Sequence, residues 1–194
     1  MGAAMGAVPA FTLSYQIDRH DRLVVLSESW REFALANDGA AVLPERVLGR
    51  RLWDFVQDRN LGQLYRHLVA RVRSGPAVEF PYRCDSPAQR RLFLMRVAPA
   101  EKDRIEFRSV LQSAEDREWI NLLDARERRG PGVVRLCSWC LRVALGPEEW
   151  VELEEAVTQL RLLEVDRPPD LTHGICPRCQ EKMVRLLPGL PTGG

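Results

Sequence analysis

Residues 78–113 read VEFPYRCDSPAQRRLFLMRVAPAEKDRIEFRSVLQS, and this stretch decides the predicted fold. It contains three runs in which apolar residues recur at about every second position, Val78 to Cys84, Leu92 to Val97 and Ile105 to Leu111. This period is typical of half-buried strands, and the Asp-Ser-Pro segment between the first two runs favours a turn. Three strands in sequence predict an antiparallel sheet.

The chain before this stretch supplies two more strands and several helices. The predicted elements are strands at Leu13–Ile17 and Leu23–Leu26, a helix that starts at Glu28, a short helical piece at Leu52–Val56 and a longer helix from about Asn60 to Ser74. Gly75 suits the end of that helix. The fold class is therefore predicted as α+β, with a five-stranded antiparallel sheet and helices on one face.

Short motifs that follow one another along residues 11–113 carry a family resemblance. They are Gln16-Ile-Asp18, Leu23-Val24, Ser29-Trp30-Arg-Glu-Phe33, Leu48-Gly-Arg-Arg-Leu-Trp53-Asp54-Phe55, Phe80-Pro-Tyr-Arg-Cys-Asp-Ser-Pro87 and Arg91-Leu-Phe-Leu-Met95. Their order and spacing resemble a PAS domain, which has five antiparallel strands and a central set of helices on one face. The resemblance implies a sensory domain whose interior holds a haem, a flavin, a small metabolite or no ligand.

Four of the five cysteines form two Cys-x-x-Cys pairs near the end of the chain, in Cys137-Ser-Trp-Cys140 and Thr172-His-Gly-Ile-Cys176-Pro-Arg-Cys179. This pattern resembles a cysteine module of bacterial signalling proteins. A two-residue spacer lets one tight turn direct both thiolates at one metal, and two such turns supply the four sulfurs of a tetrahedral site. We therefore predict one Zn²⁺ ion held by Cys137, Cys140, Cys176 and Cys179.

Three other interpretations of these cysteines stay open at this stage. They are an iron–sulfur cluster, a redox-responsive switch in which the pairs sense oxidation, and four thiols packed as small apolar side chains. His173 offers a nitrogen ligand or a hydrogen bond to a metal-bound sulfur, although a loop role next to Gly174 is preferred. Cys84 is more than fifty residues from the nearest pair, so it is not predicted as a ligand.

The PAS-like part offers no residue that we assign to a cofactor. His67 is the one candidate for a haem ligand, but it lies beside the apolar stripe of its predicted helix, which favours exposure to solvent. Large apolar side chains are expected to fill the interior, so no tightly bound chromophore is predicted. The hairpin is expected to carry ion pairs, in which Arg83 or Arg91 binds Asp85 or Asp54, and an anion-binding or partner-facing edge stays open as the alternative.

Changes in composition divide the chain into five predicted segments. They are a disordered tail at 1–10, a PAS-like sensory domain at 11–113, a connector helix and linker at 114–132, a small helical four-cysteine zinc module at 133–187 and a second disordered tail at 188–194. The connector helix is expected from Glu115 to about Arg128, before Gly130-Pro-Gly132. Within the cysteine module, a further helix is expected to begin at Pro147.

Charge and missing motifs exclude several classes of protein. The chain carries 28 Lys and Arg against 27 Asp and Glu, and residues 137–194 carry 6 against 9, which is a poor electrostatic match for a nucleic acid. No segment is apolar enough to span a membrane, and no catalytic motif is present, so a cytoplasmic protein that is not an enzyme is predicted. The predicted function is a signal-transduction sensor or adaptor. Its expected partners are another protein or a second copy of the chain, with a small-molecule ligand as a further option for the PAS-like domain.

Overall fold

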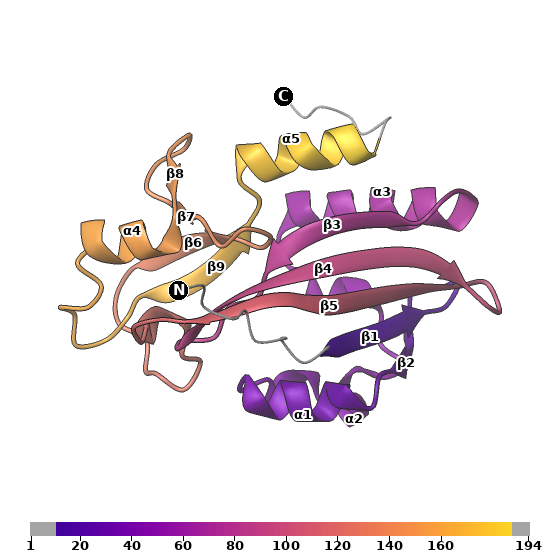
Figure 1. The fold of residues 1–194 in the computed structure, drawn as a ribbon, viewed down its shortest axis with the longest axis horizontal. Helices are drawn as coiled ribbons and strands as arrows, with labels where there is room; N and C mark the ends of the chain where they lie inside the picture. Colours follow the sequence, from indigo (N-terminus) through magenta and orange to yellow (C-terminus); the bar gives the residue numbers. More distant parts are fainter. Residues whose placement is uncertain (1–10, 188–194) are drawn as a thin grey trace, which may run out of the picture.

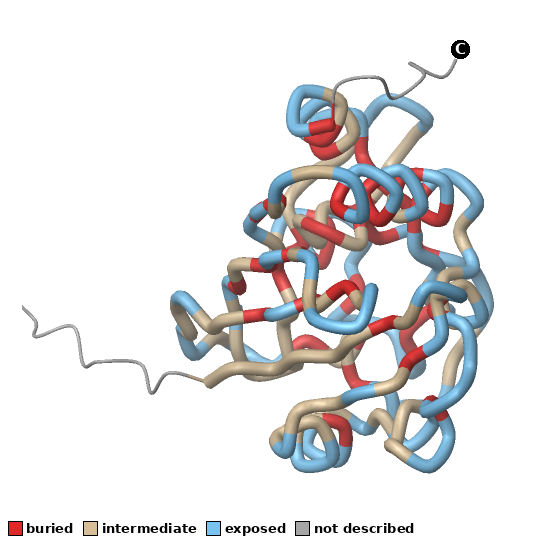
Figure 2. The backbone as a smooth tube through the Cα atoms, turned by 90° about the vertical axis from the view of Figure 1, so that its right-hand side faces the viewer, coloured by how far each residue is buried: buried red, intermediate tan, exposed pale blue. Residues whose placement is uncertain are grey.

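The computed structural model of the chain describes residues 11–187, so the predicted tails at 1–10 and 188–194 lie outside the described residues. Two β-sheets form the frame of the molecule, and helices pack against them (Figure 1). Buried positions gather between these layers, whereas turns and outer helix faces are exposed (Figure 2). Among the described residues, no helix has both the length and the apolar character needed to cross a membrane.

The larger sheet has five antiparallel strands in the order β2-β1-β5-β4-β3. They are β1 (Thr12–Ile17), β2 (Leu23–Leu26), β3 (Val78–Arg83), β4 (Gln89–Ala100) and β5 (Arg104–Asp116). The prediction of a five-stranded antiparallel sheet is confirmed. β4 and β5 are longer than predicted because they pair along their whole length, with one irregularity between Leu92 and Phe93.

Helices between β2 and β3 cover one face of this sheet. They are α1 (Ser29–Ala36), the 3-10 turn η1 (Ala40–Val42), α2 (Pro44–Val47), the 3-10 turn η2 (Leu52–Phe55) and α3 (Arg59–Ser74). Tyr15 of β1 and Phe107 of β5 are opposite neighbours whose ring centroids lie 4.6 Å apart. Trp30 of α1 contacts the Tyr15 ring. Tyr65 of α3 contacts the Phe107 ring, so both helices pack on the same face of the sheet.

The smaller sheet belongs to the cysteine-bearing part and has the order β8-β7-β6-β9. Its strands are β6 (Val133–Cys137), β7 (Val143–Ala144), β8 (Trp150–Val151) and β9 (Asp170–Gly174), and its helices are α4 (Leu153–Gln159) and α5 (Pro177–Leu186). The predicted small helical module is therefore a mixed sheet with two helices. The helix expected from Pro147 begins only at Leu153, because the Leu145 N–H donates to the Glu149 carbonyl at 2.9 Å and closes a β7–β8 hairpin.

The prediction of a connector helix within 114–132 was wrong. β5 continues as far as Asp116, and only the 3-10 turn η3 (Asn121–Leu123) follows in this range. The Arg117 N–H then donates to the Ala88 carbonyl at 2.9 Å, beside the last β4–β5 pair. These cross-strand bonds satisfy backbone groups that a helix would have paired internally. The charged residues of this segment suit an exposed strand end as well as a helix, so their pattern did not separate the two.

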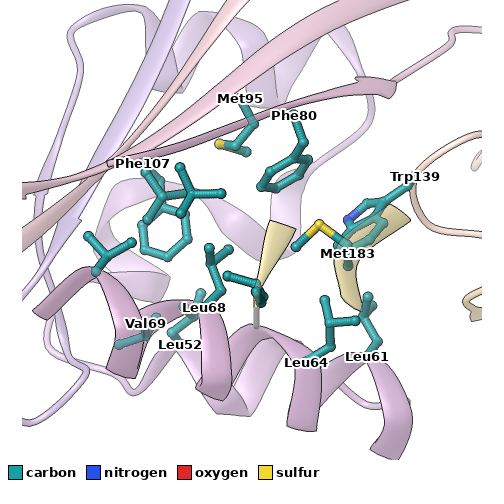
Figure 3. Packing of buried hydrophobic residues seen from close by; sticks show 14 of the residues in the cluster. Leu52, Leu61, Leu64, Leu68, Val69, Phe80, Met95, Phe107, Trp139 and Met183 are labelled. Carbon is teal, nitrogen blue, oxygen red and sulfur yellow. The ribbon is translucent and has the colours of Figure 1, made fainter. Parts of the chain in front are cut away.

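One apolar core joins the larger sheet to the cysteine turns. Leu61 and Leu64 of α3 and Phe80 of β3 lie beside Trp139 and Met183 of the cysteine-bearing part (Figure 3). A second core lies under the smaller sheet and contains Ile120, Leu122, Val134, Leu136, Val143, Leu153, Ala156, Val157 and Leu162. The ranges predicted as a sensory domain and a cysteine module therefore share a continuous buried surface.

Candidate metal centre

Four cysteine sulfurs gather at one end of the smaller sheet. The Sγ atoms of Cys137, Cys140, Cys176 and Cys179 all lie within 4.8 Å of one another, and all four cysteines are free thiols. Cys140 Sγ and Cys176 Sγ are 3.6 Å apart. Four sulfurs at about 2.3 Å from a central zinc ion would be separated by about 3.8 Å in a regular tetrahedron. The donors and their spacing therefore fit a tetrahedral metal ion.

The topology of the smaller sheet brings the two pairs together. β6 and β9 are parallel neighbours, and Cys137 at the end of β6 lies opposite Gly174 at the end of β9. The two segments that follow β6 and β9 therefore leave the sheet at the same end of its strands. Cys176 then occupies the N-cap position of α5, and Cys179 lies in the first turn of that helix. A parallel strand pair and a helix start thus position sulfurs from segments 36 residues apart.

Backbone hydrogen bonds hold the turns in this arrangement. The Cys176 N–H donates to Cys137 Sγ at 3.4 Å, which is the type of N–H to sulfur bond expected for a metal-binding turn. The Ser138 N–H donates to the Gly174 carbonyl at 2.9 Å and ties the first pair to β9. The Cys137 N–H donates to the Arg142 carbonyl at 2.8 Å and closes the first turn. The sulfurs are therefore held in place by the main chain.

Proximity of the thiols sets their protonation. Neighbouring thiols, Cys140 first, donate hydrogen bonds to the sulfur of Cys137 and lower the pKa of Cys137. The same contacts, with Cys137 first, raise the pKa of Cys140 and of Cys179. The contact with Cys137 raises the pKa of Cys176, but the hydrogen bonds from Cys140 and Cys179 outweigh it and lower this pKa to about 7. The four thiols thus titrate as one coupled group in which Cys137 and Cys176 favour the thiolate. A metal cation that displaces the remaining thiol protons would be held by four charged ligands.

The first cysteine turn is anchored to β3, the edge strand of the larger sheet. The Arg83 N–H donates to the Trp139 carbonyl at 2.7 Å. The Trp139 ring lies 5.1 Å from the Phe80 ring between centroids, and its Nε1 donates to Tyr65 Oη at 3.3 Å. Trp139 stands between Cys137 and Cys140, so this turn contacts both β3 and α3 directly.

An ion-pair network around a buried carboxylate provides a second connection, between the larger sheet and helix α4 of the cysteine-bearing part. The Asp85 carboxylate is fully buried and pairs with Arg83 and Arg117, the latter at 2.8 Å. Both guanidinium groups also reach Glu154 of α4, at 3.0 and 3.1 Å. The predicted Arg83–Asp85 pair is confirmed. The parts played by Arg117 and Glu154 were not predicted. Arg117 is 32 positions from Asp85 and Glu154 is 71 positions from Arg83, so no local sequence pattern links them.

Three other candidate residues lie outside the four-sulfur group. Cys84 follows β3 and is half-buried, and burial raises the pKa of its thiol. His173 lies on β9 opposite Leu136 and is exposed, so its predicted loop position was wrong. His67 is exposed on α3, as predicted, with Nδ1 at 3.0 Å from the Gln63 carbonyl.

Comparisons with known proteins add no assignment. No protein-family model matches the chain, and no curated protein matches it either. The four sulfurs are consequently the strongest indication of function in residues 11–187.

Proposed function

We propose that Cys137, Cys140, Cys176 and Cys179 hold one structural zinc ion. The observation that carries this proposal is the spacing of the four Sγ atoms, all within 4.8 Å. Zinc favours tetrahedral sets of thiolates, and four protein ligands leave no open position for a substrate, which is typical of a structural site. When bound, the ion crosslinks the end of β6, the turn that follows it and the start of α5.

We also propose that residues 11–113 form a PAS-like sensory domain, and that the chain acts as a cytoplasmic sensor or adaptor and not as an enzyme. The five-stranded antiparallel sheet with its inserted helices supports the PAS-like assignment. The bond between Arg83 and Trp139 and the Asp85 network support a role of the zinc module in stabilising that domain or relaying its state.

A protein partner or a second copy of the chain is the proposed target. With the connector helix absent, Trp119 and Leu35 are the side chains that support such a contact. Trp119 is 45% exposed and Leu35 is 59% exposed, and both line a hollow of about 320 Å³. Exposed apolar side chains that lie together often mark interaction surfaces. Sedimentation at tens of micromolar distinguishes self-association from a monomer that needs another protein.

Metal analysis of cysteine variants tests the zinc proposal. Each of the four Cys→Ser variants is expected to lose most of its zinc, because three ligands hold the ion far less firmly than four. Cys84→Ala is the matched control and is expected to keep about one zinc per chain. Loss of zinc from Cys84→Ala, or its retention by all four Cys→Ser variants, would contradict the assignment.

The redox-responsive switch is the second candidate, and one observation favours it. Cys140 is partly exposed and lies 3.6 Å from Cys176 of the other pair. In this scheme hydrogen peroxide oxidises two thiols to one disulfide and is reduced to two molecules of water, and the metal is released. Zinc release by equimolar peroxide that thiol reductants reverse would support the switch, whereas zinc retention under these conditions would leave a purely structural site.

A further inference from the structure

A groove with a volume of about 380 Å³ lies between the larger sheet and the cysteine turns. β3, β4, the first cysteine turn and α5 form its walls. Its apolar surface comes from Phe80, Leu92, Trp139, Met183 and Leu186. Leu92 and Leu186 are 39% and 41% exposed, so part of this surface faces water. The volume falls within the range of small-molecule sites, which is about 300–1,000 Å³.

The charged side chains of the groove are almost all cationic. Five of them are basic, Arg83, Arg90, Arg142, Arg178 and Lys182, and one is acidic, Glu152. Glu152 is neutralised by Arg83 at 3.3 Å and by Arg142 at 2.9 Å.

The remaining three cations, Arg90, Arg178 and Lys182, have no ion-pair partner within residues 11–187. The one acidic residue of α5, Glu181, faces Arg185 at 4.0 Å. Three unpaired cations beside an apolar surface therefore create a local preference for an anion.

The β3 edge in this groove is poorly suited to binding a peptide as an added strand. β3 is the last strand of the larger sheet, so its outer edge would be the place for such pairing. Pro81 lacks an N–H on this edge, and the Arg83 N–H is already bonded to the Trp139 carbonyl. With these two donors missing, side-chain chemistry and not strand pairing defines the occupant.

We infer that this groove binds a small amphipathic organic anion. Its carboxylate or phosphate group would pair with Arg90, Arg178 and Lys182, and its apolar body would cover Leu92, Leu186 and the Trp139 edge of the groove. Arginine forks are well matched to both head groups. Cys140 and Cys179 also line the groove, so the ligand would sit against the proposed zinc turns. This inference rests on the proposed sensor function, and it adds that the ligand sensed is a small amphipathic organic anion.

Calorimetric titration with four probes tests the binding itself. Octanoate and octyl phosphate, which combine a charge with an apolar chain, are expected to bind saturably at one site per chain. Octanol, which lacks the charge, and inorganic phosphate, which lacks the chain, are expected to bind at least roughly tenfold more weakly. Whichever of the first two binds more tightly identifies the preferred head group. Equal binding of octanoate and octanol, or of octyl phosphate and inorganic phosphate, would overturn the inference.

A pair of variants on α5 locates the site. The double variant Arg178→Ala, Lys182→Ala is expected to weaken octanoate binding by roughly tenfold, because it removes two of the three unpaired cations. Arg185→Ala removes a cation from the same helix outside the groove and is expected to change the affinity less than about twofold. Equal effects of the two changes would refute the location.

Zinc content, measured on the same samples, separates the two proposals. Octanoate binding by protein without zinc would leave this inference standing and contradict the zinc site. One zinc per chain without octanoate binding would support the zinc site and overturn the inference that the groove binds an organic anion.

Discussion

Replacing Trp139 by alanine tests whether the first cysteine turn and the larger sheet form one core. The Trp139 side chain is buried, and its ring centroid lies 5.1 Å from that of Phe80 and 6.2 Å from that of Tyr65. Its Nε1 also donates the 3.3 Å hydrogen bond to Tyr65 Oη. Truncation of a buried tryptophan costs about 3–5 kcal/mol in the free energy of unfolding. Trp139 also borders the groove, where water can fill part of the space, so we expect the lower end, about 3 kcal/mol.

Urea unfolding followed by far-UV circular dichroism measures this cost. With a slope of about 2 kcal/mol per molar urea, a loss of about 3 kcal/mol lowers the midpoint by about 1.5 M. Trp119→Ala is the matched control, because Trp119 is 45% exposed and its loss is expected to cost less than about 1 kcal/mol. Zinc content is determined for both variants, so that loss of metal is not mistaken for loss of packing. If Trp139→Ala were no less stable than Trp119→Ala, the shared core would be refuted.

Three further changes probe the ion-pair network and the sulfurs. Asp85→Asn leaves Arg83 and Arg117 without their buried carboxylate and is expected to cost about 3 kcal/mol in urea unfolding, against less than about 1 kcal/mol for the exposed Asp54→Asn; equal costs would contradict the network. Burial opposes ionisation of Glu154, but its backbone hydrogen bond and Arg83 outweigh burial and lower its pKa below 4.5. The stability that the ionised Glu154 contributes is therefore present above pH 4.5 and is lost as the pH falls through the pKa of the folded state. The stability difference between the wild type and Glu154→Gln should therefore shrink between pH 7 and pH 3, and a constant difference would be evidence against this ion pair. Cys176→Ser should increase amide hydrogen exchange in β6, β9 and α5 far more than in β1 and β2, and a uniform increase would argue against a local metal crosslink.

Short apolar runs, several of them with a period of about two residues, were sufficient to predict the five strands of the larger sheet. A strand with one face on the core often carries this period, although β2 is an unbroken apolar run, Leu-Val-Val-Leu. The pattern failed where tertiary pairing decided the conformation. The range predicted as the connector helix lacks an apolar stripe of either period. Its first residues, up to Asp116, belong to β5, and the bond from the Arg117 N–H to the Ala88 carbonyl continues the cross-strand pairing. The β7–β8 hairpin is likewise closed by hydrogen bonds from the Leu145 and Gly146 N–H groups to the Glu149 carbonyl, which no sequence period reveals.

The cysteine spacing predicted which four sulfurs come together and that Cys84 does not join them. Two turns of the form Cys-x-x-Cys constrain their own geometry locally, so this part of the site can be read from the chain. The contacts between the cysteine turns and the larger sheet could not be predicted in this way. Trp139 contacts Tyr65, 74 positions away, and Arg83 reaches Glu154, 71 positions away. Contacts at such separations depend on how the two sheets pack, and local patterns in a single sequence do not predict that packing.

Native mass spectrometry of the wild-type chain, purified under reducing conditions without chelators, tests the central claim most directly. The four-cysteine account predicts one species whose mass exceeds that of the 22.2 kDa chain by one zinc ion, less the protons that the ion displaces. Acid denaturation of the same sample should return the unmodified mass of the chain with all five thiols reduced. A metal-free mass, or a mass increment that corresponds to iron with inorganic sulfide, would contradict the structural zinc site.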